Sequence, residues 1–134
     1  MSVSGHYASK IRVYYEDTDA GGVVYHANYL KFMERCRSDW LATKGCKPQQ
    51  PTDEWGVILA VRSLQLEYFR PARLGDLLEV SVIPESIGGA SVFLSQTISG
   101  EKGLLAEGRF KIACLDVKSF KPCRIPDELK RKIS

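Results

Sequence analysis

Residues 14–29 read YYEDTDAGGVVYHANY and bring two aspartates and a histidine together between two regular elements. Before the loop, residues 10–15 alternate polar side chains with β-branched and aromatic ones, which predicts a strand. After it, apolar side chains recur at helical spacing, which predicts a helix over residues 27–44. The stretch is therefore expected to turn the chain from a strand into a long helix.

The start of that helix is a place where acyl-transfer chemistry can be assembled. Gly21 and Gly22 let the backbone bend and come close to a ligand. A helix N-terminus carries unpaired amides and a partial positive charge, so the amides from His26 to Tyr29 are expected to hold an anion or a developing oxyanion. Beside them, the carboxylate of Asp19 can attack an acyl carbonyl or activate water. Aspartate and glycine are also ordinary turn residues.

Metal binding is a further interpretation of the same residues. Asp17, Asp19 and Gly22 fall at positions 1, 3 and 6 of an EF-hand count, but position 12 is Asn28 and the preceding element is a strand. The four cysteines form no C-x-x-C pair, so zinc is not expected either. They are Cys36, Cys46, Cys114 and Cys123. We expect no metal site, and we expect Cys36 and Cys114 to be buried thiols.

The remainder fits one α+β domain of 134 residues. Strands are predicted at residues 57–70, 76–87, 91–99 and 104–116. Pro71 ends the first of these, and glycines at 88–89 and 100–103 predict hairpin turns between the others. Residues 45–55 are predicted to be a mobile loop and residues 127–133 a short helix. This order predicts an antiparallel sheet wrapped around one long helix.

Residues 13–37 resemble the signature of the YbgC-type, Tol-Pal-associated acyl-CoA thioesterases, relatives of 4-hydroxybenzoyl-CoA thioesterase. The resemblance continues through residues 67–76 and, more weakly, through 118–124. It implies one hot dog domain over residues 1–134. Because such domains pair their sheets edge to edge with sites between subunits, it also implies a homodimer or homotetramer.

The resemblance implies hydrolysis of acyl-CoA to free acid and coenzyme A, with no cofactor because coenzyme A is part of the substrate. Asp19 would then be the catalytic carboxylate, as nucleophile or general base. The amide of His26 would polarise the thioester carbonyl, and Asp17 would be a structural turn residue. The residues expected to bind substrate are Tyr25, Gly22, Arg70 and Arg73.

Basic residues are candidates for the phosphates of coenzyme A, since charge-assisted hydrogen bonds orient such groups. The sequence does not choose among Arg62, Arg70, Arg73, Lys121 and Arg124. With a net charge of +3 and no recognised motif, nucleic-acid binding is not expected.

Two other function classes stay open at this point. A hot dog dehydratase or hydratase needs a histidine with an acidic partner, for which His26 and Glu34 are the candidates. A binding or scaffold module would keep the pocket and serve an acyl carrier protein or a membrane-associated complex. The first ten residues lack the apolar core of a signal peptide, and the apolar stretch at 56–61 is too short to span a bilayer, so a cytoplasmic protein is expected.

Overall fold

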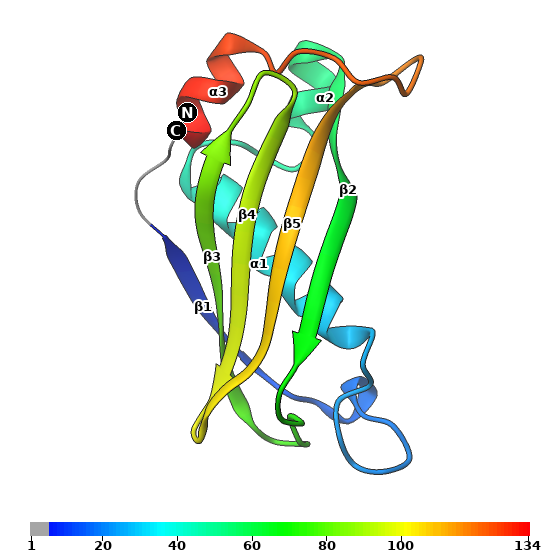
Figure 1. Ribbon diagram of the computed structural model, residues 1–134, viewed down its shortest axis with the longest axis vertical. Coiled ribbons are helices and arrows are strands. Elements are labelled where there is room, and N and C mark those ends of the chain that lie inside the picture. The colour runs from blue at the N-terminus through cyan, green and yellow to red at the C-terminus, as the bar shows by residue number, and fades with distance from the viewer. Residues whose placement is uncertain (1–5) are drawn as a thin grey trace.

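The computed structural model describes residues 6–134, in which an antiparallel five-stranded sheet curves around one long helix (Figure 1). The strands are β1 (Tyr7–Arg12), β2 (Val57–Tyr68), β3 (Leu77–Ile87), β4 (Ser91–Gly100) and β5 (Gly103–Asp116). The helices are α1 (Asn28–Thr43), α2 (Gln50–Trp55) and α3 (Asp127–Ile133), with a 3-10 turn, η1 (Tyr15–Asp17), before α1. The sheet order is β1-β3-β4-β5-β2, so the predicted sheet around a central helix is confirmed, with β1 and β2 at its edges.

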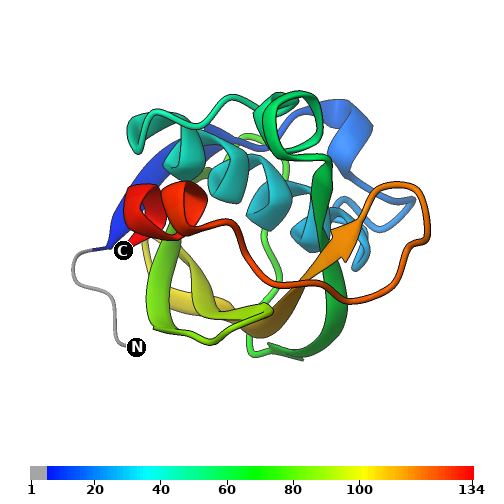
Figure 2. The ribbon, with the colours of Figure 1, turned by 90° about the horizontal axis from the view of Figure 1, so that it is seen from above.

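Helix α1 lies on the concave side of the sheet (Figure 2). Its buried face contains Tyr29, Phe32, Met33, Cys36 and Trp40. The predicted helix is one residue longer at each end than the observed one. Helix and sheet approach closely at Gly108, where an added Cβ would lie 2.7 Å from the Phe110 ring and 3.2 Å from the Met33 sulfur. A glycine on β5 therefore permits this packing.

The first strand was predicted too far along the chain. It covers Tyr7–Arg12, and the chain leaves the sheet soon afterwards, although Val13 still bonds Asp76 and Gly75 through its backbone. The Asp17 carboxylate accepts a hydrogen bond of 2.9 Å from the Tyr14 amide and so favours the tight turn η1. The hydrogen bond from the Tyr14 amide to the Asp17 side chain thus favours a turn over the strand that alternation predicts through residue 15.

The predicted loop at 45–55 was also wrong in its second half, which forms α2. Pro51 stands in the first turn, where its fixed φ suits a helix and its missing N–H loses no bond. Gly56 ends the helix in the left-handed region at φ 65°. The other strands lie within two residues of their predicted bounds, and the helix at 127–133 is confirmed.

Between residues 6 and 134, no helix is both long and apolar enough to cross a membrane. The prediction about a signal peptide rests partly on residues 1–5, which lie outside the described part of the chain.

Candidate active site

The stretch that opened the sequence analysis folds into a short antiparallel ladder. The Asp19 amide donates to Val23 O at 2.9 Å, Thr18 pairs with Val24, and the Tyr25 amide donates to Asp17 O at 3.0 Å. Residues 17–19 therefore run against residues 23–25. Asp19 lies at the outer end of this ladder, and His26 follows its inner end, beside the start of α1.

Asp19 is exposed, and one of its carboxylate oxygens accepts the Gly21 amide at 2.8 Å. Its backbone carbonyl accepts the Gly22 amide at 3.1 Å, so the residue is held by the turn it belongs to. No hydrogen bond joins the Asp19 and His26 side chains within residues 6–134. The two residues lie at opposite ends of the ladder.

Asp17 has a different role from Asp19 because it is buried, with 5% of its surface exposed. Its two carboxylate oxygens accept the Tyr14 amide at 2.9 Å and the Asn28 side-chain amide at 3.0 Å. These bonds join η1 to the first residue of α1. The contacts agree with the structural role expected for Asp17.

The peptide at His26 is held from two directions. Tyr25 O accepts the Asn28 amide at 2.8 Å, so it points toward the start of the helix. The Tyr25 C=O and the His26 N–H belong to the same trans peptide and point in opposite directions. The His26 N–H is therefore turned away from the helix. The Tyr68 hydroxyl donates to His26 O at 2.7 Å. In the described chain, the His26 amide has no backbone acceptor, so it is a donor available to a ligand.

Tyr68 was not among the predicted site residues, although it lies in one of the stretches that carry the family resemblance. Burial, and then the nearby Tyr29, raise the pKa of Tyr68, which keeps its hydroxyl protonated as a donor. The two rings meet edge to face at 5.1 Å, and the Tyr29 hydroxyl accepts the Ala72 amide at 3.0 Å. Both tyrosines thus fasten the end of β2 and residue 72 to the start of α1.

Two of the predicted substrate-binding residues lie on the ladder itself. The Tyr25 ring is 48% exposed and packs on the His26 ring with centroids 4.5 Å apart. Gly22 is exposed at the turn and has φ 78°, a conformation that other residues rarely adopt. No carboxylate bonds the His26 ring in residues 6–134, so the acidic partner that a dehydratase needs is not in contact there.

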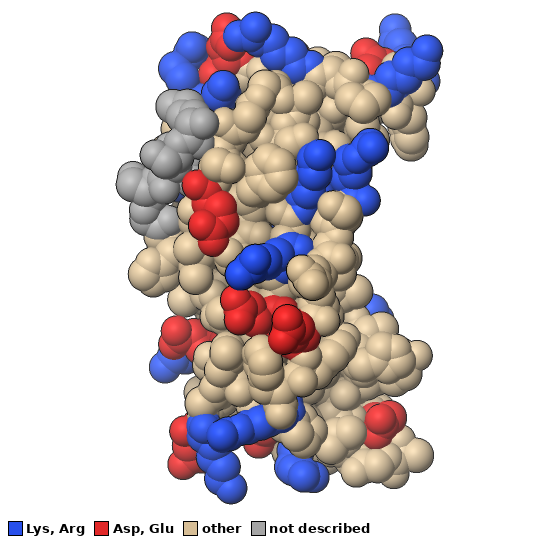
Figure 3. All heavy atoms as spheres, viewed as in Figure 1, with Lys and Arg blue, Asp and Glu red and all other residues tan. Residues whose placement is uncertain are grey.

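The other two predicted substrate-binding residues, Arg70 and Arg73, line one groove of about 680 Å³ beside the ladder. Val23 pairs with Arg73, and the Val24 amide donates to Ala72 O at 2.8 Å, which places the groove next to the turn. Arg12 and Lys102 also line it. Figure 3 shows basic side chains, with acidic ones beside them, at this end of the molecule and others at the opposite end. Asp76 and Glu101 are the acidic residues of the groove.

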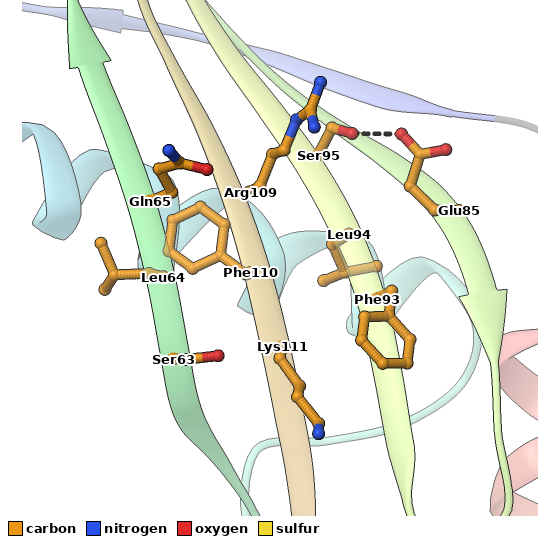
Figure 4. A pocket seen from close by; sticks show the side chains of 10 residues that line it. All are labelled: Ser63, Leu64, Gln65, Glu85, Phe93, Leu94, Ser95, Arg109, Phe110 and Lys111. Carbon is orange, nitrogen blue, oxygen red and sulfur yellow. Dashed lines mark hydrogen bonds between the residues drawn. The ribbon is translucent and has the colours of Figure 1, made fainter.

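The structure separates the remaining phosphate candidates from this groove. Arg62 lies on β2, and Lys121 and Arg124 lie in the C-terminal segment at the opposite end of the sheet. A second groove, of about 530 Å³, crosses the outer face of the sheet and contains none of the predicted site residues (Figure 4). There, Glu85 accepts a hydrogen bond from Ser95, and Lys111 lies over the Phe93 ring.

Comparison with known proteins identifies the family. The family model of the thioesterase superfamily matches residues 21–107. The chain belongs to the thioesterase superfamily. This match begins at the turn of the ladder and includes α1, the Arg70 and Arg73 groove residues and most of the sheet.

Curated relatives within the superfamily are similar over almost their whole length. The chain is 40% identical over 120 residues to the acyl-CoA thioesterase YbgC of Haemophilus influenzae, covering 90% of this chain and 88% of that one. It is 42% identical over 120 residues to the acyl-CoA thioester hydrolase YbgC of Escherichia coli, covering 89% of each. The resemblance to YbgC-type thioesterases is confirmed.

A solved structure agrees at the level of the fold. The DHNA-CoA thioesterase of Staphylococcus aureus superposes with a TM-score of 0.84 at 27% identity, covering 96% of this chain and 90% of that chain. The hot dog architecture expected from the sequence is therefore confirmed by both the sheet order and its structural relatives.

Proposed function

We propose that the protein hydrolyses acyl-CoA thioesters, with Asp19 as the reacting carboxylate and the His26 amide as the oxyanion donor. One observation carries the proposal: an exposed carboxylate and an unpaired amide end the same rigid ladder, next to a groove lined by arginines. The curated relatives named as acyl-CoA thioesterases support the substrate class. Coenzyme A enters as part of the substrate, so the proposal needs no cofactor.

In the proposed reaction the thioester carbonyl oxygen accepts the His26 N–H, and the nearby N-terminus of α1 favours the negative charge that develops there. Asp19 then adds to the carbonyl carbon, and the C–S bond breaks so that coenzyme A leaves as its thiolate, which takes a proton from water. Water hydrolyses the resulting anhydride to free acid and restores Asp19. In the alternative course, Asp19 takes a proton from the water that attacks, and the products are the same.

The experiment that tests this proposal is thiol release from a panel of acyl-CoAs, comprising short aliphatic, long aliphatic and aromatic acyl groups. Release above the uncatalysed rate for at least one member is the expected result. If none is hydrolysed while an acyl-carrier-protein thioester is, the substrate carrier is wrong. If neither is hydrolysed and acyl-CoA still binds, the binding-module alternative replaces the enzyme.

We expect His26→Ala to lower kcat far less than removal of the Asp19 carboxylate, because the alanine keeps the backbone amide that binds the oxyanion. The side chain contributes mainly its packing on Tyr25. Steady-state kinetics of the two variants side by side check this. An equal loss in both would give the imidazole a direct role in the chemistry.

We expect Arg73→Met to raise KM for acyl-CoA by about 10-fold or more at nearly unchanged kcat, because a charge-assisted bond contributes roughly 1.5–3 kcal/mol. Arg124→Met is the matched control, since Arg124 is exposed and lies outside both the groove and β2. An acyl-pantetheine thioester, which lacks the nucleotide phosphates, should be hydrolysed equally by both variants. A KM change with that substrate too would contradict phosphate binding by Arg73.

The proposal includes a homodimer formed through β2. Among the described strands, β2 pairs with β5 alone, which leaves the outer edge of a 12-residue strand open. Val61, Leu64 and Tyr68 on this strand are 42%, 42% and 46% exposed. A long edge strand with apolar side chains is a surface that a second copy can cover by edge-to-edge pairing.

A further inference from the structure

Two cysteines come together where the end of β5 meets the C-terminal segment. Figure 1 shows this segment, in orange and red, at the end of the sheet opposite to the loop that precedes α1. Cys114, near the end of β5, and Cys123, in the segment that leads to α3, have their sulfur atoms 3.7 Å apart. Cys114 is fully buried, and Cys123 is partly exposed. Spacing along the chain did not indicate this pair, because it is not a C-x-x-C motif.

The backbone around the pair has the geometry of an antiparallel ladder. Leu115 pairs with Pro122, the Cys123 amide donates to Cys114 O at 2.9 Å, and the Asp116 amide donates to Lys121 O at 2.9 Å. Cys114 and Cys123 therefore stand directly opposite each other. At a hydrogen-bonded position of an antiparallel pair, opposite Cα atoms are about 5.5 Å apart, inside the roughly 4.4–6.8 Å range that disulfides span. Only one of the two bonds of such a pair forms here, because the Cys114 amide donates to Ala90 O at 2.9 Å. Disulfide formation requires the two sulfur atoms to move from 3.7 Å to about 2.0 Å apart.

We propose that Cys114 and Cys123 are an oxidative modification site, at which a hydroperoxide produces an intramolecular disulfide that ties the C-terminal segment to β5. That segment contributes Ile125, Leu129 and Ile133 to the core. It is otherwise held by single bonds such as Ile125 N–H to Gly89 O at 2.8 Å and Lys132 Nζ to Gly45 O at 3.0 Å. The disulfide would join it covalently to the end of β5.

The two chemical steps balance with hydrogen peroxide as the oxidant. The Cys123 thiolate, which is the accessible one, attacks a peroxide oxygen; the O–O bond breaks, leaving a sulfenic acid on Cys123 and, after protonation, one water. The Cys114 sulfur then attacks the Cys123 sulfur, the S–S bond forms, and the hydroxyl leaves with the Cys114 proton as a second water. Two thiols are oxidised by two electrons in total, and one peroxide is reduced.

The second step should be the slower one at neutral pH. Burial, and then the neighbouring Cys123, raise the pKa of Cys114 to about 12, so little of its thiolate is present. The rate of disulfide closure is therefore expected to increase as the pH rises from 7 to 9, because the fraction of Cys114 present as thiolate increases.

Peptide mapping of the full-length protein tests the proposal. The folded protein is treated with hydrogen peroxide, free thiols are blocked with N-ethylmaleimide, and the chain is digested with trypsin without reductant. Cleavage after Lys118 places the two cysteines in separate peptides, residues 112–118 and 119–124. The expected result is these two peptides joined with the loss of two hydrogens and separated again by dithiothreitol.

Variants and a thermal measurement complete the test. Cys123→Ser should abolish the joined peptide, whereas Cys46→Ser, which removes a different buried thiol, should leave it unchanged. Oxidation should raise the melting temperature of wild type by about 5 °C and leave that of Cys123→Ser unchanged. Two results would overturn the proposal, in both of which Cys114 is still a free thiol. In one, Cys123 is oxidised to sulfinic acid; in the other, it is joined to a second chain. A joined peptide that forms only when the protein is unfolded in urea, and not in the folded protein, would also overturn the proposal.

Discussion

Asp19→Asn is expected to lower kcat for acyl-CoA hydrolysis by about 10² to 10⁴, because loss of a reacting base or carboxylate removes that much catalysis. Asparagine keeps an oxygen that can accept the Gly21 amide, so the turn should survive. The residue is exposed and is not one of the core residues. Asp19→Asn therefore removes the negative charge while keeping the turn that positions the side chain.

Thiol release by wild type and Asp19→Asn, with circular dichroism and urea unfolding on both proteins, measures this effect. Asp17→Asn is the matched control two residues away. Its buried carboxylate accepts two hydrogen bonds, so this variant should lose about 1–3 kcal/mol of unfolding free energy. A near-normal rate for folded Asp19→Asn would remove Asp19 from the mechanism, and a rate loss confined to Asp17→Asn would exchange the two roles.

Gln96→Leu is expected to lower the free energy of unfolding by about 3 kcal/mol, because it leaves buried polar groups without partners. Gln96 has no exposed surface, and its amide nitrogen donates to Met33 O at 3.0 Å and Ser81 O at 3.1 Å. Its oxygen accepts the Arg37 guanidinium at 2.8 Å. Burial lowers the pKa of Arg37, because its guanidinium is partly removed from solvent. Gln96→Leu would take away the oxygen that accepts a hydrogen bond from this charged group.

Urea unfolding of a double-mutant cycle measures the second effect. The double variant Arg37→Met with Gln96→Leu should be more stable than Gln96→Leu alone, because it removes the charge together with its acceptor. Ser95→Ala on the same strand is the control at a partly exposed position. If Gln96→Leu unfolds at the wild-type urea concentration, the hydrogen bonds of Gln96 contribute nothing to stability.

The predicted elements were accurate wherever periodicity or a pair of glycines defined them. Periodicity located α1 to within one residue at each end, and glycine turns located the hairpins between β3, β4 and β5. Errors arose where a side chain changed the local backbone, as Asp17 did after β1 and Pro51 did in α2. Asp19, Gly22, Tyr25 and His26 come from one continuous stretch, so their placement along one short ladder followed from their order along the chain.

By itself the sequence determined the strands, the long helix and the segment that holds Asp19 and His26, because turn residues and periodicity act over a few neighbouring residues. The hot dog fold and the family followed from the resemblance of residues 13–37 to a known family signature. Tertiary structure alone decided which distant groups meet: the Tyr68 hydroxyl on His26 O, Arg12 and Lys102 in the groove of Arg73, and Cys114 against Cys123. These contacts depend on strand order and register. A shift of one residue turns every side chain of a strand to the other face, so no local pattern specifies them.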